Sequence, residues 1–247
     1  MNILICNDDG IQSKGLKALA DRLSLNNNVL VVAPDGNRSA AAHSLSIEKP
    51  IKLREENLSN RYKSLAISGT PVDCVKMAKL LVKDFKNNVT VAGINKGHNI
   101  GSDVLYSGTV SIAYEAAFFG DIAFSFSAFN LGDSDFKLYA EYAEKIIQTL
   151  YPISKSGDIW NVNFPDINAE IKGVKFASLG KHLYTDRYEK VGVDSYKLVG
   201  ELIDHDDNLI DSDVELIKQG YITVTPLVFN KTNYAKFSEL DNVEFIK

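Results

Sequence analysis

The sequence predicts an α/β fold: a Rossmann-like three-layer sandwich around a mostly parallel sheet, with a β-rich elaboration at its C-terminal end. Short apolar runs, typical of buried strands, alternate with segments in which apolar residues recur every three or four positions, as on one face of a helix. Strands and helices that alternate in this way form right-handed crossovers, which cover both faces of a parallel sheet with helices. The 45% apolar and 24% charged composition of the 247 residues is that of a soluble globular chain.

The first two thirds of the chain carry this alternation. A helix begins at Thr70 because threonine is a good N-cap, Pro71 suits the first helical position, and Asp73 stands where a capping box has its acidic residue. A long loop is expected over residues 35–46, and a minor strand or hairpin arm over 47–53. The predicted core strands cover residues 2–7, 29–33, 89–94, 122–129 and 159–164, and the other helices cover 16–23, 109–119 and 136–147.

The pattern loosens after about residue 170. Strands are expected over residues 174–179, 196–203 and 221–227, and a short helix over 213–218. Aromatic and polar residues alternate from Tyr184 to Leu198. This alternation predicts a hairpin arm, and it suits a hairpin that binds a partner as well as an ordinary surface hairpin, because it requires only one covered face.

Charge and missing motifs exclude several classes of protein. The net charge of −5 argues against a protein that coats duplex nucleic acid or an anionic membrane. No apolar run approaches the roughly 18 residues of a membrane helix, and the first residues lack the features of a signal peptide. Cys6 and Cys74 form no disulfide framework and are expected to be buried thiols, so we expect a cytoplasmic protein. The dinucleotide, P-loop, nucleophile-elbow and HExxH motifs are all missing from the sequence.

Polar side chains follow three of the predicted strands. Asp8 and Asp9 follow the first strand, Ser39 lies in the loop after the second, and Asn95 follows the third. The carboxyl ends of parallel strands meet at one edge of the sheet, where ligands bind. Adjacent carboxylates raise each other's pKa unless a cation lies between them, and oxygen ligands without clustered Cys or His favour Mg²⁺ or Mn²⁺. The alternative, in which one aspartate caps a helix and the other is solvated, is weaker because several polar groups converge.

The tripeptide Ser-Gly-Thr precedes two predicted helices, at residues 68–70 and 107–109. Such a turn presents backbone N–H groups at the positive end of a helix, where a phosphate binds. Plain N-capping is favoured for the first turn, and phosphate binding slightly for the second. His43 and His98 lie in the loops at the same edge and are expected to be surface imidazoles rather than acid–base groups. Asp204–Asp207 is expected to be a solvated acidic turn rather than a metal site.

Several of these segments, taken in order, resemble the stationary-phase survival protein SurE family. The resemblance implies a metal-dependent phosphatase of nucleoside monophosphates, a 5′(3′)-nucleotidase, and some members also hydrolyse short polyphosphate. It also implies a divalent ion held at Asp8, Asp9, Ser39 and Asn95. The matching segments are ILICNDDG (3–10), VAPD (32–35), NRS (37–39), HSLS (43–46), SGTPVDC (68–74), GINKGHNIG (93–101), DVLYSGTV (103–110) and YITVTPL (221–227).

The resemblance also implies a dimer or tetramer with exchanged C-terminal segments. We therefore expect one domain over residues 1–247, with a Rossmann-like core over 1–170 and an elaboration over 171–247 used in oligomerisation. The chain departs from the family at residues 40–42, which are alanines where glycine is common, and over 181–210, which match poorly. These departures concern substrate preference and oligomer contacts rather than the metal site.

The sequence therefore predicts hydrolysis of nucleoside 5′- and 3′-monophosphates with one Mg²⁺ or Mn²⁺ ion per subunit. Asp8 and Asp9 are the catalytic pair, and attack by a metal-activated water is preferred over attack by Asp8 itself. The phosphate is expected at Ser107, Gly108 and Thr109, with help from Asn99. The alternative from another class is a non-catalytic module that binds nucleotide or phosphate. An oligomeric structural protein, in which the aspartates only cap a helix, is weaker still.

Overall fold

The computed structural model describes residues 1–129, 135–166, 168–203 and 209–239. Asp204–Asp207 lie outside these ranges. The central strands are β1 (Asn2–Cys6), β2 (Asn28–Pro34), β3 (Leu53–Glu56), β4 (Lys63–Ile67), β5 (Val89–Lys96), β6 (Ile122–Ala128), β7 (Ile159–Phe164), β8 (Gly173–Phe176) and β13 (Tyr221–Leu227). The helices are α1 (Lys14–Leu23), α2 (Pro71–Leu81), α3 (Gly108–Phe118), α4 (Asp135–Leu150) and α5 (Asp213–Lys218), with 3₁₀ turns at Gly101–Leu105, Tyr151–Ile153 and Tyr234–Glu239.

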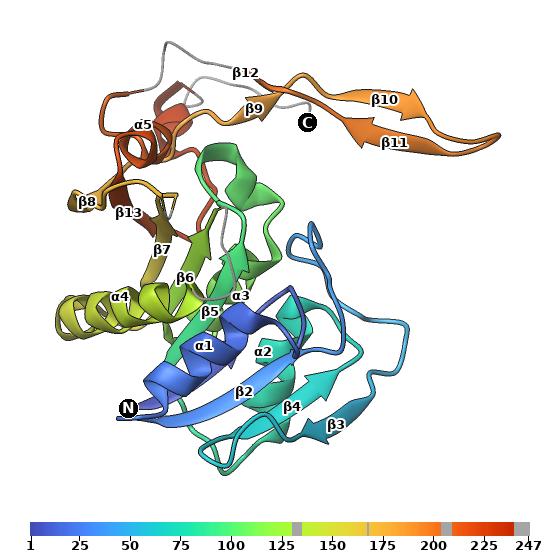
Figure 1. The fold of residues 1–247 in the computed structure, drawn as a ribbon, viewed down its shortest axis with the longest axis vertical. Coiled ribbons are helices and arrows are strands. Elements are labelled where there is room, and N and C mark those ends of the chain that lie inside the picture. Colours follow the sequence, from blue (N-terminus) through green and yellow to red (C-terminus); the bar gives the residue numbers. More distant parts are fainter. Residues whose placement is uncertain (130–134, 167, 204–208, 240–247) are drawn as a thin grey trace, which may run out of the picture.

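Within the described ranges, nine strands form one sheet in the order β3-β4-β2-β1-β5-β6-β7-β13-β8. The pairs from β4 through β7 are all parallel, as is β13 with β8, whereas β3 with β4 and β13 with β7 are antiparallel. Helices cover both faces of this sheet (Figure 1). The predicted α/β three-layer architecture is thus confirmed, and β8 and β13 of the C-terminal elaboration extend the same sheet.

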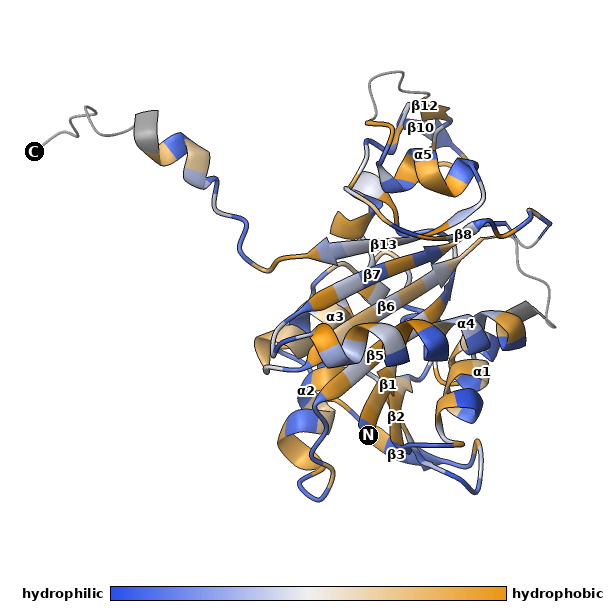
Figure 2. Cartoon of the chain, turned by 90° about the vertical axis from the view of Figure 1, so that its left-hand side faces the viewer, coloured by the Kyte–Doolittle hydropathy of each residue, from blue (hydrophilic) through white to orange (hydrophobic). Residues whose placement is uncertain are grey.

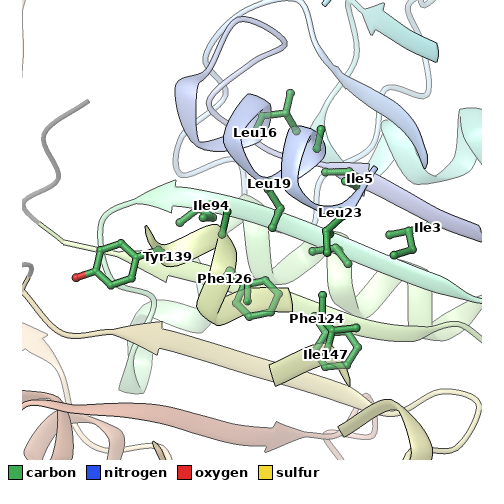
Figure 3. Packing of buried hydrophobic residues seen from close by; sticks show 14 of the residues in the cluster. Ile3, Ile5, Leu16, Leu19, Leu23, Ile94, Phe124, Phe126, Tyr139 and Ile147 are labelled. Carbon is green, nitrogen blue, oxygen red and sulfur yellow. The ribbon is translucent and has the colours of Figure 1, made fainter. Parts of the chain in front are cut away.

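The apolar core lies in two layers, one on each face of the sheet. On one face, Leu16 and Leu19 of α1 and Tyr139 of α4 belong to one buried cluster with Phe124 and Phe126 of β6 (Figure 3). On the other face, apolar residues of α2 and α3 pack against the same strands. Figure 2 shows the inner strands as hydrophobic and the outer surfaces of the helices as largely hydrophilic, the division that an amphipathic helix over a buried sheet requires.

In the segment between β2 and α2 one sequence prediction was wrong, and one strand was not predicted. Residues 47–53 form no strand before Leu53, and Ile47 is 85% exposed. The chain instead forms an antiparallel hairpin of β3 and β4, and β4 pairs in parallel with β2. The sequence of β4, KSLAI, is short and mixed, and its strand structure depends on the neighbouring edge of β2 rather than on local propensity.

The other elements lie close to their expected positions. Both cysteines are free and buried, as predicted. The expected strand over 196–203 is divided into β11 (Tyr196–Val199) and β12 (Leu202–Ile203). The first pairs with β10 (Arg187–Lys190) and the second with β9 (Leu183–Tyr184), both antiparallel. The β10–β11 hairpin projects from the body of the molecule (Figure 1), and its strands are largely exposed. In the part of the chain that the structure describes, no helix combines the length and apolarity needed to cross a bilayer.

The sheet order reverses direction at β1. The strand β1 lies between β2 and β5. The strands β2 and β4 are added on one side of β1, whereas β5 and β6 are added on its other side. In open parallel sheets such a reversal leaves a crevice beyond the carboxyl ends of the two central strands. Here those ends carry Asp8, Asp9 and Asn95, which is why this edge of the sheet holds the candidate site.

Candidate functional site

Two adjacent aspartates follow β1 directly. Asp8 is 4% exposed, and its Oδ1 accepts a hydrogen bond of 2.6 Å from the hydroxyl of Thr109 at the start of α3. Asn7 shapes the turn, because its side chain both donates to the carbonyl of Gly10 and accepts from the N–H of Gly10. The turn thus fixes the backbone that carries both carboxylates at the end of β1.

Burial makes this pair of carboxylates electrostatically unfavourable. Desolvation raises the pKa of Asp8. Desolvation, followed by the charge of Asp8, raises the pKa of Asp9 to about 6, and the backbone N–H and positive charge of Lys96 offset this only in part. A cation between the two carboxylates would favour the ionised form of both.

Asn95 reaches the site through an irregularity in β5. The register between β5 and β6 shifts between Ala92 and Asn95, as in a β-bulge, which redirects the end of a strand. Gly93, with a φ of +121°, allows this, since a Cβ there would lie 2.3 Å from the carbonyl oxygen of Phe126. The amide of Asn95 donates to the carbonyl of Gly97 at 2.9 Å.

Ser39 lies in an exposed loop after β2. The N–H and the hydroxyl of Ser39 both donate to Oδ1 of Asn37, at 2.7 and 2.6 Å. The N–H of Arg38 donates to the carbonyl of Asp8 at 2.7 Å, so this loop is tied directly to the end of β1. Of the sequence-predicted metal residues, Asp8 and Asp9 follow β1, Ser39 lies in the loop after β2, and Asn95 lies at the end of β5, all at one edge of the sheet.

The second Ser-Gly-Thr turn adjoins Asp8. Ser107 caps α3 by accepting from the N–H of Val110 at 3.0 Å. A Cβ on Gly108 would lie 2.8 Å from the Cβ of Asp8 and 2.9 Å from its Oδ2, so only glycine allows this approach. The turn thus brings the backbone N–H groups at the N-terminus of α3 beside the aspartate pair, an arrangement that suits a phosphate.

The first Ser-Gly-Thr turn is a helix cap, as predicted. Thr70 and Asp73 form a reciprocal capping box at the start of α2, with Asp73 accepting from the N–H of Thr70 at 2.8 Å. The hydrogen-bonding groups of this turn therefore stabilise the helix end.

Residues 3–186 match the family model described as Survival protein SurE. The chain belongs to the SurE family. A protein named 5′-nucleotidase SurE from Clostridium botulinum (strain Alaska E43 / Type E3) is 39% identical over 255 aligned residues, covering 98% of this chain and 99% of that protein. A protein of the same name from Kosmotoga olearia is 38% identical over 94% of each chain. The crystal structure of the SurE protein from Aquifex aeolicus superposes with a TM-score of 0.81 at 32% identity, covering 96% of this chain and 97% of that one.

In this SurE chain the Ser39 loop has an unusual backbone. Ala40 and Ala42 have φ values of 56° and 50°, in the left-handed region that favours glycine. They are two of the three consecutive alanines at residues 40–42. Each such residue costs roughly 1–2 kcal/mol unless its surroundings hold it in place.

Contacts that the sequence did not reveal hold this loop. The N–H of Ala42 donates to the carbonyl of Tyr106 at 3.1 Å. His43, expected to be a surface imidazole, is partly exposed, but its Nε2 lies 2.9 Å from the carboxylate of Glu115, which is buried and also pairs with Lys76 at 2.6 Å. The loop is therefore anchored to α3 and to the turn that precedes it.

Asn99 lies in a buried network between the ends of β6 and β7. Its N–H donates to Asn163 at 2.8 Å, its side-chain amide donates to Ser127 at 2.7 Å, and its carbonyl accepts from Asn161 and Asn163. This network fixes the start of the loop that leads to Ser107. Its sequence signal is the alternation of polar residues within buried strands, in SFS of β6 and NVN of β7.

His98 differs from the surface imidazole that the sequence predicts. Its ring is partly buried, and Nε2 lies 2.8 Å from the carbonyl oxygen of Phe164. Burial lowers the pKa of this imidazole, so it is neutral near pH 7. A neutral, anchored ring supports the loop and is poorly suited to act as an acid.

The residues present suit a hard divalent ion. The donors are two carboxylates, a hydroxyl and an amide, all oxygen ligands of the kind that Mg²⁺ and Mn²⁺ prefer. Within the described ranges no group of three or more His, Cys, Asp or Glu forms a separate metal site. Desolvation raises the pKa of both Asp8 and Asp9, and the charge of Lys96 counteracts this only in part for Asp9.

We predict that Gly108→Ala displaces the carboxylate of Asp8, because the added methyl group meets that side chain at 2.8–2.9 Å. Alanine itself favours a helix, so the secondary structure persists while the affinity for Mn²⁺ falls by about tenfold or more. Calorimetric titration measures the affinity, and Gly192→Ala is the control, since its Cβ would have its nearest contact, the Cβ of Ser195, at an ordinary 3.4 Å. Unchanged affinity in Gly108→Ala would refute the packing argument.

We predict that His98 titrates below the ordinary histidine value of 6.5. Between its folded pKa and 6.5 the unfolded chain binds more protons at this residue, so its contribution to stability is complete above pH 6.5 and is lost as the pH falls through that window. An NMR pH titration of the imidazole signals, assigned by comparison with His98→Gln, measures the midpoint. A midpoint at or above 6.5 would contradict the burial effect.

Proposed function

We propose that this chain is a metal-dependent 5′-nucleotidase that hydrolyses nucleoside 5′-monophosphates, and also 3′-monophosphates, to nucleoside and phosphate. One observation carries the proposal: Asp8, the buried member of an adjacent carboxylate pair, contacts the N-terminus of α3, where its Oδ1 accepts from the hydroxyl of Thr109 at 2.6 Å. That arrangement supports a cation site beside a phosphate site. Relatives named 5′-nucleotidase SurE, 36–39% identical over nearly all of this chain, support the same activity.

In this proposal Asp8, Asp9, Ser39 and Asn95 hold one Mg²⁺ or Mn²⁺ ion. When bound, the ion supplies positive charge that stabilises the phosphoryl oxygens in the transition state and increases the acidity of the attacking water. Thr109 orients Asp8 through its hydroxyl. The turn at Ser107–Thr109 binds the phosphoryl oxygens through the N–H of Gly108, where the helix dipole favours negative charge, because the N–H of Ser107 donates to the carbonyl of Asp103.

Water is the preferred nucleophile. Oδ1 of Asp8 accepts the hydroxyl of Thr109, and the same carboxylate is a proposed metal ligand. Both interactions stabilise the ionised carboxylate and lower its nucleophilicity, which disfavours an aspartyl-phosphate on this residue. The same site chemistry extends to the terminal phosphate of short polyphosphate, which we include in the proposed substrate range.

The direct test is phosphate release from a panel of nucleoside 5′- and 3′-monophosphates and short polyphosphate. Release is measured after treatment with EDTA and again after Mg²⁺ or Mn²⁺ is restored. The proposal predicts release that stops with the chelator and returns with the metal. Tight nucleotide binding without release under either metal would contradict it and favour the non-catalytic binding module.

We predict that Asp8→Asn folds normally but loses activity by at least about a hundredfold, the order of loss when one electrostatic partner of a transition state is removed. Circular dichroism checks the fold, and steady-state kinetics at saturating Mg²⁺ check the activity. The control is Asp84→Asn, an exposed carboxylate in the segment between α2 and β5. Full turnover in Asp8→Asn would remove the aspartate pair from the mechanism.

We also propose that the chain forms a homodimer or homotetramer. The β10–β11 hairpin exposes Tyr188, Val193, Tyr196 and Leu198, and the segment after β13 extends away from the sheet (Figure 2). Exposed apolar side chains on projecting segments are typical of surfaces that are covered on assembly.

We predict a mass of two or four chains by light scattering coupled to size-exclusion chromatography. Replacing Tyr188 and Tyr196 by Ser should shift the distribution toward smaller species, whereas replacing the exposed Leu25 by Ser should not. A monomer for the unmodified protein at micromolar concentration would contradict the proposed assembly.

A further inference from the structure

A buried aspartate of the C-terminal elaboration binds the loop over residues 97–106, which leads to the phosphate turn at Ser107–Thr109. Asp213, the first residue of α5, is fully buried. Its Oδ2 accepts from the N–H of Gly101 at 2.9 Å, and its Oδ1 accepts from the N–H groups of Gly180 and Val214 at 2.8 and 2.9 Å. One carboxylate therefore joins two backbone segments that are distant in sequence. Burial raises its pKa, and the three N–H donors counteract this effect.

The two segments that Asp213 joins are in direct contact. Gly101 has a φ of +50°, and a Cβ there would lie 2.5 Å from the carbonyl oxygen of Gly180. The next two residues of the loop continue the junction. The hydroxyl of Ser102 donates to the carbonyl of His182, and the carboxylate of Asp103 lies 2.7 Å from Nδ1 of the same histidine. The elaboration thus binds three consecutive residues of the loop.

Contacts within the elaboration and with the loop hold Asp213 in place. The N–H of Asp213 donates to the carbonyl of Ser178 at 2.8 Å, and the N–H of Ser178 donates to the carbonyl of Asp211 at 3.2 Å. Val214 and Ile217 of α5 form a buried apolar cluster with Ile100 of the loop. The side chain of Asp213 therefore lies at the centre of a packed interface and not on a free surface.

Hydrogen bonds connect residues 101–106 of the loop to the candidate site. Gly101–Leu105 is a 3₁₀ turn, and the carbonyl of Asp103 accepts from the N–H of Ser107, the N-cap of α3, at 3.2 Å. The carbonyl of Tyr106 accepts from Ala42 in the Ser39 loop. A shift of Gly101 would therefore move both the phosphate turn and the loop that carries Ser39.

We propose that Asp213 is a positioning residue for the phosphate turn at Ser107–Thr109. The elaboration, through Asp213, completes the phosphate site of its own chain in addition to any role in assembly. This inference rests on the proposed phosphate site. It predicts that Asp213→Asn, which replaces an acceptor oxygen by an amide that cannot accept, weakens phosphate binding while the ion site at Asp8 and Asp9 persists.

The experiment measures three quantities for the wild type, Asp213→Asn and His182→Ala. Calorimetry gives the affinity for Mn²⁺ and, with Mn²⁺ present, for inorganic phosphate, and kinetics give KM and kcat for a nucleoside monophosphate. For Asp213→Asn we expect phosphate affinity to fall about tenfold or more, KM to rise and kcat to fall, with Mn²⁺ affinity within about twofold of wild type. We expect His182→Ala to shift the same quantities in the same direction, by less.

The control is Glu215→Gln in α5, whose carboxylate pairs with Lys218 near the surface and does not contact the loop. It should leave all three quantities unchanged. Partial unfolding of a variant lowers kcat but leaves KM and the fitted phosphate affinity unchanged, so these two distinguish positioning from stability. If both Asp213→Asn and His182→Ala bind phosphate with the wild-type affinity and have the wild-type KM, the proposal is overturned. Absence of phosphate release by the wild type would refute the proposed activity, whereas phosphate binding would still test the positioning.

Discussion

The site depends on one electrostatic constraint: two adjacent carboxylates are held, partly desolvated, at the end of the central strand. Asp8 is almost fully buried, and its charge contributes to raising the pKa of Asp9 to about 6. A folded chain retains such a pair only where a cation offsets the repulsion or where function requires it. The position of β1 between β2 and β5 determines where the pair lies, because the sheet order reverses there.

The neighbouring loops are built around this pair. Thr109 binds the Asp8 carboxylate, Arg38 binds the Asp8 carbonyl, and the N–H of Lys96 lies 3.4 Å from the Asp9 carboxylate. Each of these residues lies next to a proposed ligand or phosphate-binding residue in sequence. The same few contacts that orient the aspartates therefore also set the positions of Ser39, Asn95 and the phosphate turn. In this way the rigid sheet supports a site whose residues lie mainly on loops.

Local signals in the sequence predicted the elements that depend on local interactions. The cap at Thr70 and Asp73 forms as expected because each partner lies within one helical turn of the other. The buried strands β1 and β5 were visible as apolar runs that end in turn residues. By contrast, β4 was missed because its structure depends on pairing with β2, which no short segment encodes.

The contacts that shape the site were the least predictable. Asp213 and Gly101 are 112 residues apart, and Asn99 binds residues more than 60 positions away. The sequence showed which residues could bind a metal and a phosphate, because those residue types follow the strands directly. It did not show what holds them, since buried hydrogen-bonding partners such as Asn163 and Glu115 resemble ordinary polar residues until the fold brings them together.

The central claim is that a divalent ion neutralises the Asp8–Asp9 pair, and thermal unfolding of the metal-free protein tests it most directly. Calorimetric scans would compare the protein in EDTA with the protein in increasing concentrations of Mn²⁺. An ion that binds only the folded state raises the melting temperature progressively with concentration. The account predicts such a rise in the wild type and its loss when both aspartates are replaced by asparagine. An equal rise in the doubly substituted protein, or no rise in the wild type, would contradict it.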